Sequence, residues 1–70
     1  MSKIHNLVNR QLKKALKIDG QSVALISRQT RLGARWIHYF NDGTIKSPGI
    51  EKLEVLHLYL CKLLGEPSVL

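Results

Sequence analysis

The sequence predicts a small all-α fold, a bundle of four to five helices that contains a helix-turn-helix. Seventy residues are enough for one domain, so residues 1–70 are expected to form a single unit with a modest core. Apolar residues recur at steps of three and four along the chain, which is the spacing of one buried helix face. Turn-forming residues at Asp19–Gly20, Asn41–Gly43 and Pro48–Gly49 interrupt this pattern and separate the helices.

The first helix is predicted from Ile4 to Ile18. The residues expected on its buried face are apolar and recur with helical periodicity: Ile4, Leu7, Val8, Leu12, Ala15 and Leu16. The basic residues fall largely on the opposite, solvated face: Arg10, Lys13, Lys14 and Lys17. The helix is expected to end at Asp19 and Gly20.

The segment from Ser22 to Pro48 predicts a helix, a tight turn and a second helix. Ser22 can cap the first of these helices, in which Val23 and Ile26 are three apart and face a common core. The second helix follows Gly33 and ends near Gly43, which can adopt a left-handed conformation without steric cost. Leu32, which closes the turn, lies on one apolar arc with Trp36, Ile37 and Phe40 of this helix, whereas Ala34, Arg35 and His38 lie opposite and Tyr39 flanks them.

Pro48 and Gly49 open the last predicted helix, in which Leu53, Leu56, Leu60 and Leu64 form the stripe that closes the core. Further apolar residues lie off this stripe or in the tail and are candidates for a homodimer interface: Val55, Leu58, Tyr59, Val69 and Leu70. The alternative is that Leu58 packs under the N-terminal residues of its own chain.

The chain resembles the lambda-repressor-like, or XRE-type, helix-turn-helix family of phage Cro proteins and repressors, from about Ile4 to Leu64. The resemblance depends on an ordered set of positions: Ile26, Leu32, Ile37, Phe40, Gly43, Pro48 and Leu53. It departs at Val23, which replaces a polar residue that touches phosphate, at Ser27, where a small Ala is usual, and at Arg31. Because Arg31 occupies the turn position where the family has Gly, the resemblance implies a left-handed backbone there, which costs about 1 kcal/mol.

Charge is concentrated in the same part of the chain. Residues 1–46 hold nine of the eleven basic residues and two acids, a net charge of +7, whereas residues 47–70 hold two basic and three acidic residues, a net of −1. Such a field attracts the phosphates of nucleic acid. The predicted base contacts are Ala34, Arg35, His38 and Tyr39, and the predicted phosphate contacts are Ser22, Arg28, Arg31, Lys46 and Ser47.

The sequence gives little support for a secreted protein, a membrane protein, an enzyme or a metal-binding protein. The lone Cys61 excludes an internal disulfide and agrees with a reducing cytoplasm, in a bacterial or phage-infected cell. No signal peptide or membrane-spanning run is evident, and no nucleophile motif suggests an enzyme. His57 and Cys61 are four apart, but two ligands do not make a structural zinc site, so we interpret them as a surface histidine beside a buried thiol. No cofactor, metal or small-molecule ligand is expected.

These features together predict a sequence-specific DNA-binding transcriptional regulator. The resemblance and the small size favour a homodimeric repressor of Cro type that occludes a promoter by binding an inverted repeat. One alternative is an antitoxin or accessory regulator that binds its own promoter. A second is a protein-interaction module that keeps the fold and binds a partner through Trp36 and the Leu-rich last helix.

Overall fold

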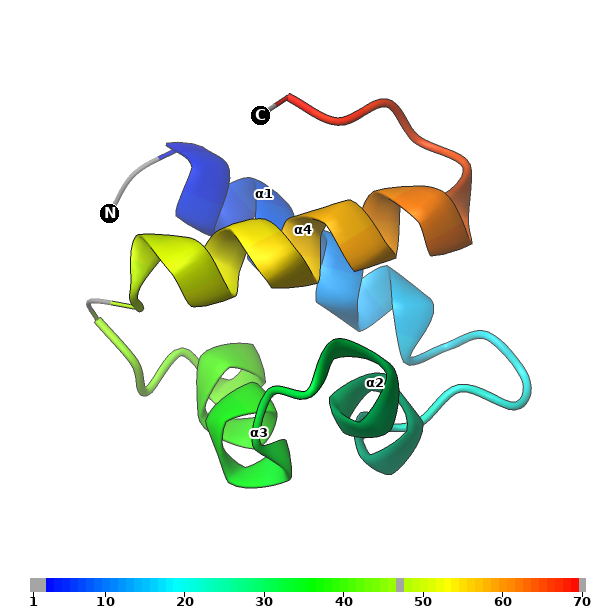
Figure 1. The fold of residues 1–70 in the computed structure, drawn as a ribbon, viewed down its shortest axis with the longest axis horizontal. Coiled ribbons are helices and arrows are strands. Elements are labelled where there is room, and N and C mark those ends of the chain that lie inside the picture. The colour runs from blue at the N-terminus through cyan, green and yellow to red at the C-terminus, as the bar shows by residue number, and fades with distance from the viewer. Residues whose placement is uncertain (1–2, 47, 70) are drawn as a thin grey trace.

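The computed structural model describes residues 3–46 and 48–69, and within them it contains four α-helices and no strand. The helices are α1 (Lys3–Ala15), α2 (Val23–Thr30), α3 (Ala34–Asp42) and α4 (Ile50–Leu64). Figure 1 shows α4 lying across α1, with α2 and α3 side by side beneath them. The predicted all-α bundle is therefore confirmed, with four helices in the described residues.

The core lies where these four helices meet, and it is built from the apolar positions of the helical pattern. Its fully buried members come from all four helices: Val8, Leu12, Ala15, Ile26, Ile37, Phe40, Leu56 and Leu60. Leu32 and Leu53 are also buried. Six residues that we assigned to the core are only partly buried: Ile4, Leu7, Leu16, Val23, Trp36 and Leu64.

Helix α1 ends three residues earlier than predicted, at Ala15 instead of Ile18. The backbone N–H of Lys17 bonds the carbonyl of Lys14, and that of Ile18 bonds the carbonyl of Ala15, so both bonds span three residues instead of four. This tighter winding is a turn and not a continued α-helix. Gly20, with φ +88°, belongs to the connection to α2 instead of capping α1.

The two-helix unit of α2 and α3 has the predicted local geometry. The Ser22 Oγ accepts a hydrogen bond from the Leu25 N–H at 3.2 Å and so caps α2. Arg31 follows α2 with φ 62°, and within the described residues it is the one non-glycine residue with positive φ. Ser27 stabilises the turn, since its hydroxyl donates to the Leu32 carbonyl. Gly43 ends α3 in the left-handed conformation expected for it.

A buried polar network joins α1, α4 and the C-terminal tail. The His57 ring is 0% exposed, so our prediction of a surface histidine is wrong. Its Nδ1 donates to the Gln11 Oε1 at 2.8 Å, and its Nε2 accepts from the Val69 N–H at 3.2 Å. Because the Gln11 Nε2 already donates to Glu66, the Gln11 Oε1 is the atom that faces the ring and accepts from Nδ1. Burial of His57 is tolerated since both ring nitrogens are satisfied.

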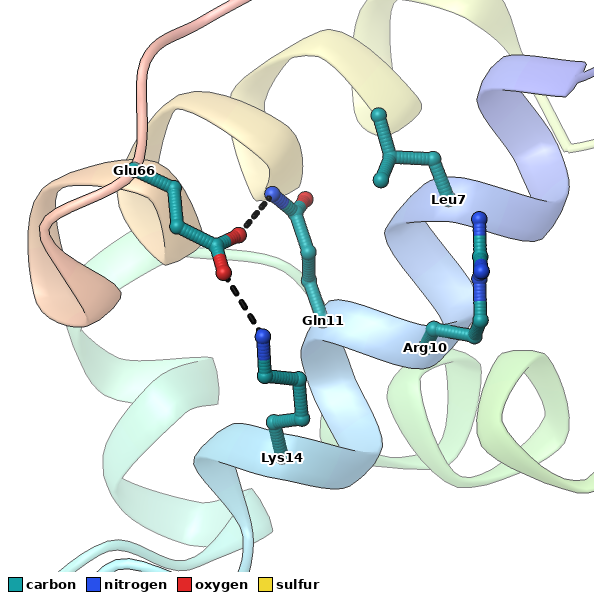
Figure 2. A pocket seen from close by; sticks show the side chains of 5 residues that line it. All are labelled: Leu7, Arg10, Gln11, Lys14 and Glu66. Carbon is teal, nitrogen blue, oxygen red and sulfur yellow. Dashed lines mark hydrogen bonds and ion pairs between the residues drawn. The ribbon is translucent and has the colours of Figure 1, made fainter.

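Glu66 anchors the tail to α1 at the rim of this network (Figure 2). Its carboxylate accepts from the Gln11 Nε2 at 2.9 Å and pairs with the Lys14 Nζ at 2.7 Å. The bond to Lys14, followed by the bond to Gln11, holds the pKa of the Glu66 carboxyl below its ordinary value. The tail is therefore held against α1 and α4 by polar contacts on both sides.

Candidate nucleic-acid interface

Helix α3 separates a buried face from an exposed face. Ile37 and Phe40 are 0% exposed, and Trp36 is half-buried against the core. The opposite side of the helix is exposed and contains the predicted base-contact residues: Ala34, Arg35, His38 and Tyr39. The structure thus brings these four side chains together on one helix surface. Asp42 shares that surface but lies at the C-terminal end of the helix.

Helix α3 is held in place by polar contacts from α1. The Asn9 Nδ2 donates to the Phe40 carbonyl at 2.8 Å, and the Lys13 Nζ donates to the Asn41 carbonyl at 2.7 Å and to its Oδ1 at 3.1 Å. Both groups bond carbonyls in the last turn of α3, where the helix dipole also favours the Lys13 charge. The sequence analysis missed these roles, because nothing local in α1 indicates a partner 28 to 31 residues away.

Aromatic stacking positions the buried face of α3. The Phe40 ring lies between His5, at a centroid distance of 5.1 Å, and Trp36, at 5.3 Å, with both pairs stacked. The Lys52 Nζ lies 5.8 Å from the Trp36 ring centroid, which is a cation–π distance. The position of Trp36 on the helix predicts that it packs against the core. The structure confirms this packing, with the side chain partly buried.

The predicted phosphate-contact residues that the structure describes lie on α2, at its two ends and in the loop after α3. Ser22, Arg28, Arg31 and Lys46 are all exposed, and Ser22 also has its role as the α2 cap. Ser47 lies outside the described residues. Within residues 3–46 and 48–69, the side chains of Arg28, Arg31, Arg35 and Lys46 take part in no ion pair or hydrogen bond. Their charges are therefore available to an anionic partner.

The dimer-interface candidates on α4 and the tail divide into two groups. Val55, Leu58 and Val69 are 42%, 47% and 64% exposed, so the N-terminal residues that the structure describes, from Lys3 onward, do not bury Leu58. Tyr59 is partly buried against the core, and its hydroxyl donates to the Gln21 Oε1 at 3.5 Å, so only part of its side chain is open to a partner. Leu70 lies outside the described residues, and the sequence analysis missed Ile50, which is 62% exposed.

Comparison of the chain with protein-family models, with curated proteins and with solved structures finds no match. In the part of the chain that the structure describes, no three His, Cys, Asp or Glu residues are grouped so that they could hold a metal ion. No helix among the same residues has the length and apolar character needed to cross a membrane.

Proposed function

We propose that this protein is a sequence-specific double-stranded DNA-binding regulator that acts as a homodimeric repressor of Cro type. The observation that carries the proposal is the exposed face of α3, where a small residue, an arginine, a histidine and a tyrosine lie together while the opposite face is anchored in the core. A major groove of B-DNA, about 12 Å wide, admits one α-helix.

The chemistry of this face suits base recognition. Arg35, in the first turn of α3, can donate two parallel hydrogen bonds to guanine O6 and N7, and this contact discriminates against other bases by about 1 to 3 kcal/mol. Ala34 allows close approach and offers a methyl group to thymine. His38 lies one turn further along, where it can reach a base or a phosphate. Asp42 is the last residue of α3, so its negative charge stays away from the phosphates when the N-terminal end of the helix enters the groove.

The surrounding basic residues provide the sequence-independent part of the affinity. Arg28, Arg31 and Lys46 are exposed and have no anionic partner among the described residues, so they can neutralise phosphates and release counterions. The contacts from Asn9 and Lys13 to the C-terminal end of α3 hold the helix at a fixed angle to these groups. A fixed angle favours sequence recognition because base contacts tolerate little displacement.

The exposed apolar residues of α4 support the dimer. One short recognition helix contacts few base pairs, and a two-fold pair doubles the contacts on an inverted repeat whose half-sites lie about 34 Å apart. An antitoxin or accessory regulator of its own promoter would use the same interface. A protein-interaction module is the candidate from a different class, and the exposure of Ile50, Val55 and Leu58 is the observation that favours it.

Selection from a pool of random DNA fragments, followed by sequencing, tests the proposal. Enrichment of an inverted repeat supports the regulator, and recovery of DNA without sequence preference contradicts it. Arg35→Ala and Arg35→Lys should then be compared on the selected site and on random DNA. Lysine keeps the charge but loses the planar fork, so both variants should lose about tenfold or more on the selected site, while Arg35→Lys keeps its affinity for random DNA. Equal losses on both DNAs would assign Arg35 to phosphate contact.

A further inference from the structure

Helix α1 has an outer face that carries positive charge and no negative charge. No Asp or Glu precedes Asp19 in the sequence, whereas α1 and the turn after it contain five basic residues: Lys3, Arg10, Lys13, Lys14 and Lys17. Arg10 lies three and four residues before Lys13 and Lys14, and Lys17 follows them at the same spacings. Like charges at these spacings destabilise a helix, so the clustering weakens α1.

The structure divides the five basic residues into two groups. Lys13 and Lys14 are used inside the chain, since Lys13 bonds Asn41 and Lys14 pairs with Glu66 (Figure 2). The other three are exposed and have no hydrogen bond or ion pair among the described residues: Lys3, Arg10 and Lys17. They are seven residues apart, so they form one line of positive charge about 20 Å long on one side of α1. We call this line the α1 basic stripe.

The α1 basic stripe and the exposed face of α3 point in opposite directions. The rings of His5 in α1 and Phe40 in α3 stack at a centroid distance of 5.1 Å, so these residues mark the sides on which the two helices face each other. At about 100° per residue, Arg10 lies about 140° around α1 from His5. Arg35 and His38 lie about 140° and 160° around α3 from Phe40. Each surface therefore points away from the other helix.

One DNA duplex does not reach both surfaces. The chain extends over 29 × 26 × 18 Å, so a duplex bound to the exposed face of α3 would have to bend around the domain to contact the α1 basic stripe. DNA has a persistence length of about 50 nm and is nearly straight over such a short distance. The stripe therefore faces away from the DNA that α3 contacts.

The chemistry of the stripe fits a polyphosphate better than a membrane. A helix that lies on a membrane inserts its apolar side into the lipid, but the apolar side of α1 is buried in the core. None of the exposed side chains of α1 is a large apolar one. Lys and Arg neutralise the phosphates of DNA and release counterions without reading the bases.

We infer that the α1 basic stripe binds the backbone of a second DNA duplex, so that a protein held on one duplex through α3 bridges it to another. The inference goes beyond the proposed function and rests on it only for the binding of the first duplex. The second contact involves phosphates alone, so it is weak, independent of sequence and strongly dependent on salt.

Capture of one duplex by another measures bridging directly. A duplex that carries the selected site is immobilised and saturated with protein, and a fluorescent duplex of random sequence is then titrated at about 50 mM salt. The double variant Arg10→Ala/Lys17→Ala should lose about tenfold in affinity for each phosphate contact, and so about 100-fold for the second duplex. Its affinity for the first duplex should stay within about threefold of wild type, because α3 is unchanged.

Lys62→Glu is the matched control for this variant. It lowers the net charge from +6 to +4, as the loss of two basic residues does, but Lys62 lies on the exposed side of α4. This variant should capture the second duplex as wild type does. The three residues changed are exposed, and circular dichroism checks that each variant stays folded.

Several results would overturn the inference. One is a wild type that captures no second duplex. Another is equal capture by wild type and the double variant, which is also the result expected if the second α3 of a dimer held the second duplex. An equal loss for Lys62→Glu would assign capture to net charge, and tighter binding of the stripe to phosphatidylglycerol vesicles than to DNA would assign it to a membrane.

The same assay separates this inference from the proposed function. If selection yields no preferred site, a random duplex takes the first position, and capture that still depends on Arg10 and Lys17 would refute the proposed function and leave the inference standing. Selection of an inverted repeat without capture would do the reverse.

Discussion

Replacing Gln11 by Met should destabilise the fold by about 2 kcal/mol, because Gln11 is the partner that permits His57 to be buried. Gln11 is 3% exposed and His57 is 0% exposed, with 2.8 Å between the Gln11 Oε1 and the His57 Nδ1. Methionine has a similar length and fills the same space, so the cavity term is small. The variant leaves the buried Nδ1–H with only the weak acceptor Cys61 Sγ, 3.6 Å away, and loss of the oxygen acceptor costs about 1 to 3 kcal/mol.

The other contacts of Gln11 add little to this loss of stability, and one of them is a weak bond from its Nε2 to the Cys61 Sγ at 3.6 Å. Its Nε2 donates to Glu66, whose carboxylate is open to solvent and keeps its pairing with Lys14. A loss near 2 kcal/mol is a large part of the stability of a small domain. Unfolding in urea at pH 7, followed by circular dichroism, measures the change in the free energy of unfolding.

Gln21→Met is the matched control, since Gln21 is partly buried and its Oε1 accepts only a 3.5 Å bond from the Tyr59 hydroxyl. We expect a loss of less than about 0.5 kcal/mol for this variant. If Gln11→Met were as stable as wild type, or lost no more than Gln21→Met, the assignment of Gln11 as the group that sustains the buried His57 would be refuted.

Three further perturbations test the core, the charges and the tail. Ile37→Ala should lose about 2 to 5 kcal/mol of folding stability in thermal unfolding through a cavity under α3, and a loss below about 1 kcal/mol would contradict full burial of Ile37. DNA affinity should fall with salt at a log-log slope near −0.9 per phosphate neutralised, and Lys46→Ala should flatten that slope in a titration by fluorescence anisotropy; equal affinity at low and moderate salt would argue against phosphate contacts. Because the pKa of Glu66 is lowered in the folded state, its contribution to stability is complete above the ordinary value of 4.5 and is lost as the pH falls through the lowered pKa. Glu66→Gln should therefore make stability less dependent on pH below 4.5, and an unchanged pH profile would exclude that contribution.

Much of the structure of α2 and α3 could be predicted from the local pattern of residues in the sequence. The helical spacing assigned Ile37 and Phe40 to the core and Arg35 to the exposed face, as the structure has them. The cap at Ser22 and the left-handed backbone at Gly43 are equally local, since they depend on side-chain chemistry and steric freedom within a few residues. The family resemblance added the left-handed conformation of Arg31, which periodicity alone does not indicate.

The burial of polar residues could be learned only from the tertiary structure. His5 and Gln11 are buried on α1, and His57 is buried on α4, although glutamine is mostly exposed in proteins and histidine is intermediate. Their burial depends on partners that are distant in the sequence, with Gln11 46 residues from His57 and 55 residues from Glu66. The contacts of Asn9 and Lys13 with α3 are of the same kind. Helical periodicity reports which side of a helix faces the core, whereas the burial of a polar group depends on whether the folded chain supplies its hydrogen-bond partners.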